Sequence, residues 1–243
     1  ASDLGYDCGL LSLSLMEDDS DDVLIGHAQA VAEVIPLFGF YLQPAVGGRI
    51  LSFDFWRRFV EIDNVLAIKI APFNRYQTLD VVRAVIDSGR QGEIALYTGN
   101  DDNIILDLIT PFCFSDRNKV KRVRIVGGLL GQWATWTLRA VEFLEEAHAV
   151  RRDSQFPSEW LTRNAEMTDV NSALFDVAHQ FSGCIPGIHE VLRRQGLMKG
   201  LWCLNPQEGL SSGQVEEIER VCSAYPHLND DDFVLEHLDA WLK

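Results

Sequence analysis

Five short apolar runs alternate with amphipathic segments over the first 150 residues of this 243-residue chain. The runs are predicted strands at Cys8–Leu15, Leu37–Gln43, Val65–Ile70, Ile94–Thr98 and Arg124–Val126. Helical periodicity follows each run, over 23–35, 53–62, 78–88, 102–109 and 129–150. Repeated strand–helix alternation is typical of a parallel α/β sheet. An open doubly wound sheet and a (β/α)8 barrel both fit the pattern.

The second part of the chain differs from the first. Residues 160–241 show helical patterns and no further strand. We therefore expect a sheet-containing part over residues 1–150 and a helical extension over residues 151–243. No GxGxxG or GxxxxGK[ST] motif follows a predicted strand, so the usual signals of a nucleotide-binding sheet are missing.

A lysine lies in the middle of the apolar run NVLAIKIAPFNR at residues 64–75. Strand alternation places Ala67, Lys69 and Ala71 on one face of small residues, opposite a bulky face fit to pack on helices. A buried lysine is costly unless it is paired or neutral. Its ammonium group could extend to water or to a carboxylate. Alternatively, Lys69 is a desolvated amine that attacks a ketone and forms a Schiff base.

Composition excludes several classes of protein. A net charge of -15 argues against binding to nucleic acid or to an anionic membrane surface. No apolar run approaches the length that spans a bilayer. The five cysteines are well separated, without a CxxC pair, which is typical of reduced thiols in a cytoplasmic protein. The histidines show no HxH or HExxH spacing, so we expect no metal.

Four motifs resemble one known family. GFYLQPAVGG, AIKIAP, YTGNDD and IVGGLLG are similar to the dihydrodipicolinate synthase / N-acetylneuraminate lyase family of Schiff-base class I aldolases. The resemblance implies a TIM (β/α)8 barrel with a C-terminal helical extension, of which this chain holds strands 4 to 8. It also implies a small-molecule 2-keto acid or sugar-acid substrate, no cofactor and a homo-oligomer, either tetramer or dimer. The family's first three βα units, with the glycine- and threonine-rich motif that binds the keto-acid carboxylate, have no match here.

The resemblance implies roles for individual residues. Lys69 matches the Schiff-base lysine, and Tyr41 matches the tyrosine that relays protons. Substrate binding is implied for residues at the ends of strands, namely Gly99, Asp101, Asp102, Gly127 and Gly128. Val46 stands where the synthases carry an arginine for the second substrate's carboxylate, which favours a hydroxylated partner substrate.

Each of these residues also has a structural interpretation. Tyr41 could be a core tyrosine with a hydrogen-bonded hydroxyl. Asp101 and Asp102 could serve as helix N-cap and first-turn acids. Gly127 and Gly128 could permit close strand-to-helix packing, or let backbone N–H groups approach a carboxylate or phosphate.

The sequence favours a lyase, an aldolase or a dehydratase, that acts on pyruvate or another 2-keto acid through a lysine Schiff base. Lys69 and Tyr41 are expected to converge on one cavity at the C-terminal edge of the sheet. One alternative is a catalytically inactive relative or incomplete barrel that acts as a binding or assembly protein. Another is a phosphate-binding α/β domain that uses Gly127 and Gly128.

Overall fold

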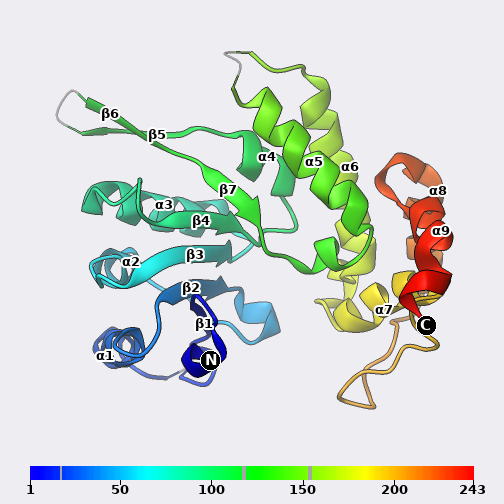
Figure 1. Ribbon diagram of the computed structural model, residues 1–243, viewed down its shortest axis with the longest axis horizontal. Coiled ribbons are helices and arrows are strands. Elements are labelled where there is room, and N and C mark those ends of the chain that lie inside the picture. Colours follow the sequence, from blue (N-terminus) through cyan, green and yellow to red (C-terminus); the bar gives the residue numbers. More distant parts are fainter. Residues whose placement is uncertain (17, 117–118, 153–154) are drawn as a thin grey trace. The chain divides into compact units, whose positions relative to one another are not determined.

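The computed structural model describes residues 1–16, 18–116, 119–152 and 155–243. Five parallel strands form one sheet in the order β1-β2-β3-β4-β7 (Figure 1). Their bounds are Gly9–Leu11 for β1, Leu37–Leu42 for β2, Val65–Ala71 for β3, Ala95–Thr98 for β4 and Ile125–Gly128 for β7. Each lies at a predicted strand, so the prediction of one parallel α/β sheet is confirmed.

Helices connect the first four strands, as the alternation predicts. They are α1 at Asp21–Ala32, α2 at Phe53–Phe59 and α3 at Arg75–Ser88. Ser52 begins α2 because its side chain accepts a hydrogen bond from the Phe55 N–H. Asn74 caps α3 in the same way, so this helix begins three residues before the predicted start at 78.

A hairpin precedes the last strand of the sheet. Helix α4 spans Ile104–Ile109, and strands β5 at Phe112–Asp116 and β6 at Lys119–Val123 then pair antiparallel. The hairpin was not predicted from the sequence, because β6 carries several charged residues and resembles a loop.

The bulky face of the sheet packs on helices. Ile68 and Ile70 are fully buried, and the rings of Phe55, Trp56 and Phe59 on α2 contact one another at 5.1 to 5.8 Å between centroids. Gly39 on β2 permits this packing, since a Cβ there would lie 2.7 Å from the Phe59 ring. The apolar core therefore lies on the helical side of β2 and β3.

Arg90 binds the backbone of the segment that leads into β3. Its guanidinium donates hydrogen bonds to four backbone carbonyls, those of Val60, Ile62, Asp63 and Val65. These carbonyls lie at the N-terminal end of β3, opposite the end where the candidate site residues gather. One cation thus bonds to carbonyls over the whole segment between the end of α2 and the first residue of β3.

The chain divides into two compact units. The first contains residues 1–100 and 107–129, and the second contains residues 101–106 and 130–243. The sequence had placed the division after residue 150. Helix α5, Thr137–Val150, instead belongs to the helical unit, where Phe143 contacts the Trp160 ring of α6 at 5.3 Å.

In its described residues, the helical unit contains four further α-helices: α6 at Glu159–Leu174, α7 at Cys184–Arg194, α8 at Gln214–Ala224 and α9 at Asp231–Trp241. Its core includes Trp136, Val170, Leu174, Ile218 and Val221. None of the helices in the described ranges is long and apolar enough to traverse a bilayer.

Candidate active site

Lys69 lies between two aromatic residues on the face of the sheet away from the helices. It is in register with Phe40 on β2 and with Tyr97 on β4. Register partners in a parallel sheet share a face, so all three side chains lie on the same side. The Lys69 Nζ lies 4.4 Å from the centroid of the Phe40 ring. At this distance the ring quadrupole attracts an ammonium group.

Small residues make room for these rings. Ala67 is in register with Phe38 on one side and with Ala95 on the other. The rings of Phe38 and Tyr97, on the strands that flank β3, reach a centroid separation of 5.2 Å. The face of small residues predicted for β3 therefore lies between aromatic side chains of the two neighbouring strands.

Gly99 lies directly beside Lys69. Its N–H donates a hydrogen bond of 2.7 Å to the Ile70 carbonyl, which continues the pairing of β3 and β4. A Cβ at Gly99 would lie 2.7 Å from the Ala71 Cβ and 2.8 Å from the Lys69 Cε. Only glycine leaves space here for the lysine stem, so the structure brings these two candidate residues together.

The two glycines of β7 differ in position. Gly127 is in register with Tyr97, and a Cβ there would lie 3.1 Å from the tyrosine ring. Gly128 is in register with Thr98, one residue further along the strand. The next α-helix begins only at Thr137, after a short 3-10 turn at Gly131–Ala134. No α-helix N-terminus directly follows these glycines, which removes one basis of the phosphate-binding alternative.

Tyr41 does not share the Lys69 face. Its register partner is Ile70, the residue after Lys69, whose side chain points to the opposite face. The Tyr41 side chain is fully buried on the helical side. Its hydroxyl donates to the Leu51 carbonyl at 3.1 Å and accepts from the Leu51 N–H at 3.2 Å. Burial raises the pKa of this hydroxyl, and the hydrogen bond with the Leu51 backbone opposes the rise. The expected convergence of Tyr41 and Lys69 on one cavity is therefore wrong.

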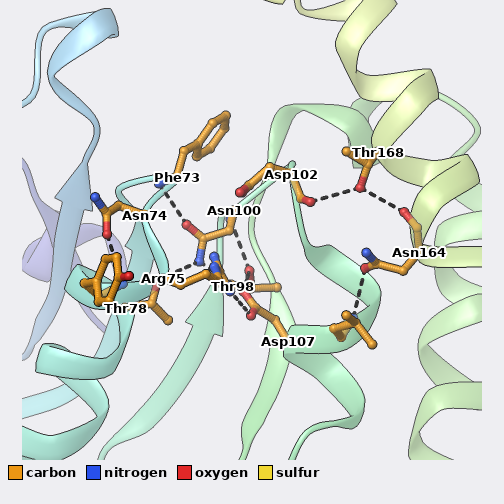
Figure 2. A network of polar contacts seen from close by, with 12 residues as sticks. Phe73, Asn74, Arg75, Thr78, Thr98, Asn100, Asp102, Asp107, Asn164 and Thr168 are labelled. Carbon is orange, nitrogen blue, oxygen red and sulfur yellow. Dashed lines mark hydrogen bonds and ion pairs between the residues drawn. The ribbon is translucent and has the colours of Figure 1, made fainter. Parts of the chain in front are cut away.

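A buried polar network supports the C-terminal ends of β3 and β4 (Figure 2). Asp107 accepts hydrogen bonds from the Thr98 hydroxyl at 2.7 Å and from the Asn100 amide at 3.0 Å, and it pairs with Arg75. The Asn100 Oδ1 accepts from the Phe73 N–H at 3.1 Å. Phe73 has a φ of 52°, a left-handed conformation that is costly outside glycine.

This network was not predicted from the sequence. Asn100 stands between two candidate residues, Gly99 and Asp101, but was not itself singled out. A side-chain amide after a strand, followed by an acid seven residues later, was the available signal. The network positions the loop after β3, which follows the lysine strand directly.

Asp101 and Asp102 belong to the second unit. There the Asp101 carbonyl accepts a hydrogen bond from the Asn171 amide at 2.9 Å. The Asp102 carbonyl accepts one from the Thr168 hydroxyl at 2.9 Å, as Figure 2 shows. Helix α4 begins at Ile104, two residues after the predicted start at 102. Both interpretations of the two aspartates, as helix-capping acids and as substrate-binding residues, stay predictions.

Within the described ranges, no group of three or more histidine, cysteine, aspartate or glutamate side chains is placed to hold a metal ion. The five cysteines form no disulfide, and burial raises the pKa of the Cys184 thiol to about 11. That thiol is therefore a poor nucleophile at neutral pH. The Lys69 face remains the candidate site for chemistry.

Comparisons with known proteins identify the fold. No family model and no curated protein sequence matches the chain. Dihydrodipicolinate synthase from Bacteroides thetaiotaomicron superposes with a TM-score of 0.68 at 14% identity, covering 92% of this chain and 68% of that chain. A prophage protein of the dihydrodipicolinic acid synthase family from E. coli K12, in complex with pyruvate, gives a TM-score of 0.66 at 14% identity, with coverages of 94% and 68%.

A variant of 2-keto-3-deoxygluconate aldolase from Sulfolobus solfataricus gives a TM-score of 0.59 at 16% identity, covering 87% of this chain and 63% of that chain. The likeness extends over both units of the chain. It confirms the predicted fold class, that of dihydrodipicolinate synthase-like (β/α)8 barrel proteins with a helical extension.

Proposed function

We propose that this chain, which has the fold shared by dihydrodipicolinate synthases and 2-keto-3-deoxygluconate aldolase, is a lyase that acts on 2-keto acids through a Schiff base at Lys69. The placement of Lys69 carries the proposal. No other described residue of the five strands is a lysine. Its stem occupies the space that Gly99 and Ala71 leave at the C-terminal end of β3, where parallel α/β folds build their active sites.

In the proposed reaction, the Lys69 amine adds to the C2 carbonyl of the keto acid and gives a carbinolamine. Loss of water from the carbinolamine gives an iminium, which draws electrons from the bond between C3 and C4. Aldol cleavage or formation of that bond, or loss of a leaving group, then becomes accessible. Cleavage leaves an enamine on Lys69; protonation of its C3 gives an iminium again, and water hydrolyses this iminium to release the keto acid and regenerate the amine. The Phe40 ring, 4.4 Å from the Lys69 Nζ, contributes to the placement of the amine.

Proton transfer needs an oxygen acid on the same face as the amine. Tyr41 is excluded by its position, since its hydroxyl is held by the Leu51 backbone behind the sheet. Tyr97 is the tyrosine in register with Lys69. We assign the proton relay to Tyr97, which stands one strand away from the reacting amine.

The partner substrate is proposed to be hydroxylated. Val46, in the turn after β2, offers no charge to a second carboxylate. The sequence resemblance assigns Asp101 and Asp102 to substrate hydroxyls, which carboxylates accept well as hydrogen-bond donors. Turnover of hydroxylated sugar acids should therefore exceed turnover with aspartate semialdehyde, and steady-state rates in the reverse order would contradict this choice.

A second candidate function follows from the position of Tyr41. A chain that keeps the lysine but has lost the tyrosine relay could bind keto acids, or form the imine, without completing a reaction. This binding-protein alternative predicts that pyruvate is trapped on Lys69 while no sugar acid is cleaved. Measuring trapping and turnover on the same preparation separates the two candidates.

Borohydride trapping with pyruvate, followed by intact mass measurement, tests the Schiff base. We expect a single pyruvate adduct on the wild-type chain and none on Lys69→Ala. Lys199→Ala, which changes an exposed lysine of the helical unit, should trap as wild type does. Either a wild-type chain that is never labelled or an equal label on Lys69→Ala would refute the assignment.

A further inference from the structure

Phe73 has an unusual backbone conformation. Its φ of 52° lies in the left-handed region, which glycine adopts freely and a bulky residue adopts only at a cost. In the described part of the first unit, Phe73 is the one non-glycine residue with a positive φ, since the other such residues belong to the helical unit. Residues of this kind gather at functional sites, where the surrounding structure holds them in place. The chain therefore keeps an aromatic side chain at a position where glycine would avoid the cost.

Asn100 holds the backbone of Phe73 in this conformation. Asn100 is fully buried, and its Oδ1 accepts a hydrogen bond from the Phe73 N–H at 3.1 Å (Figure 2). Its Nδ2 donates to Asp107 at 3.0 Å and to the Thr78 hydroxyl at 3.3 Å. A side-chain amide whose oxygen and nitrogen both have partners is fixed in one orientation. The buried network thus determines where the Phe73 backbone lies.

Phe73 lies immediately beyond the residues that surround the Lys69 side chain. It follows Ala71 by two residues, and its partner Asn100 follows Gly99 by one. A Cβ at Gly99 would lie 2.7 Å from the Ala71 Cβ and 2.8 Å from the Lys69 Cε. The backbone of Phe73 is therefore held at the C-terminal edge of the sheet, next to the two small residues that make room for the lysine stem.

The Phe73 ring is directed away from the network that holds its backbone. Figure 2 shows the ring pointing away from Asn100 and Asp107. Phe40 and Tyr97, the register partners of Lys69, lie on the face of the sheet itself. Phe73 thus supplies a further aromatic ring, farther along the strands than the amine.

An aromatic ring suits one part of a 2-keto acid better than the other. The face of the ring is electron-rich, so it attracts C–H groups and repels a carboxylate. In the proposed reaction the Lys69 amine bonds to C2, and C1 is the carboxylate. The part of the substrate that matches the ring is the chain from C4 onward, because each of its hydroxylated carbons also carries C–H groups.

We propose that Phe73 is a specificity-determining residue of the Lys69 site, whose ring contacts the substrate chain from C4 onward and favours long hydroxylated keto acids over short ones. This assignment rests on the proposed lyase function and adds to it the length of the preferred substrate. It also gives a reason for keeping a bulky side chain in a left-handed conformation at the edge of the sheet.

Cleavage of two substrates by the 243-residue chain tests the proposal. 2-Keto-3-deoxyhexonate, with six carbons, and 4-hydroxy-2-oxobutanoate, with four, both release pyruvate when the bond between C3 and C4 breaks, so one assay gives kcat/KM for both. We expect Phe73→Gly to lower the ratio of the six-carbon to the four-carbon value about tenfold, because only the longer chain reaches the ring. The four-carbon value should stay as in wild type. Phe73→Tyr keeps the ring and should keep the ratio.

The matched control is Gln180→Gly, which makes the same backbone change at a φ of 56° in the helical unit and should leave the ratio unchanged. Phe73→Gly should stay folded, with a urea midpoint no lower than that of wild type, because glycine adopts the left-handed conformation without cost.

An unchanged ratio in Phe73→Gly, or an equal fall in both kcat/KM values, would overturn the assignment of Phe73 while the trapping of pyruvate on Lys69 still supported the lyase. A wild-type chain that traps no pyruvate and cleaves neither acid would refute the lyase function and the role of Phe73 with it. The two failures are therefore distinguishable.

Discussion

Tyr41 and Lys69 lie on opposite faces of one sheet, because the register partner of Lys69 on β2 is Phe40 and not Tyr41. The sequence motifs thus suggest that the two residues form a catalytic pair, whereas in the structure Tyr41 is a core residue and Lys69 lies apart from it. The structural and chemical roles of these residues can therefore be measured independently.

Tyr41→Phe should destabilise the chain without changing the yield of trapped imine. The substitution leaves the buried carbonyl and N–H of Leu51 without a partner, which costs about 1 to 3 kcal/mol in the free energy of unfolding. Urea unfolding and borohydride trapping measure the two quantities. A stable variant with greatly reduced trapping would show that Tyr41 takes part in imine formation.

Tyr97→Phe should have the opposite effect. It removes the hydroxyl assigned to the proton relay while keeping the ring that contacts Phe38. Trapping of pyruvate should persist, whereas turnover of a cleavable sugar acid should fall by about a hundredfold, the scale of a lost general acid–base group. Tyr76→Phe, at an exposed tyrosine of α3, is the matched control, and equal turnover in both variants would exclude Tyr97 from the mechanism.

Gly99→Ala should slow imine formation. The new Cβ would lie within 2.8 Å of both the Ala71 Cβ and the Lys69 Cε, so the lysine stem must move. A misplacement of this size can cost about ten- to a hundredfold in rate. Gly92→Ala meets no atom within 4 Å and should trap at the wild-type rate, so similar rates for the two variants would contradict the packing argument.

The stability of the helical unit should depend on pH through Asp169. Hydrogen bonds from Arg220 hold the pKa of this carboxyl below its ordinary value, against the effect of burial and with help from the Tyr225 hydroxyl. A depressed folded-state pKa gives stability that is complete above the unfolded pKa of about 3.9 and is lost as the pH falls through the lower folded value.

Asp169→Asn removes this titration. Between about pH 5 and pH 2, its free energy of unfolding should fall less steeply than that of the wild-type chain. Urea unfolding over this range provides the measurement, with Asp239→Asn as an exposed control. Parallel pH profiles for wild type and Asp169→Asn would show that the Arg220 pair does not act through the carboxyl charge.

Most of the fold could be predicted from the sequence. The five strands were found because each is a short apolar run between helical segments, and parallel order follows from that alternation. The hairpin of β5 and β6 escaped because its second strand is too polar to stand out. The assignment of α5 to the helical unit depends on the contact of Phe143 with Trp160. The local sequence pattern does not predict such a tertiary contact.

The site could be predicted only to the level of strand faces. Parity placed Lys69 among small residues, and Gly99 indeed lies next to it. The alternation of side chains within β3 does not determine which residue of β2 is the register partner of Lys69. That register depends on tertiary packing, here of Gly39 on Phe59 and of Tyr41 on Leu51. Asn100 was missed because a buried amide becomes apparent only from its partners.

The four carbonyls held by Arg90 lie at the end of β3 that is away from Lys69 and Asn100. The two ends of this strand are therefore open to different kinds of change. The Arg90 contacts act on the entry into β3, whereas at the other end Phe73 and Asn100, in the loops beyond Ala71 and Thr98, are tied to each other and to Asp107. A change at the Arg90 end should therefore alter stability with little effect on the surroundings of Lys69, whereas a change at Asn100 should disturb both.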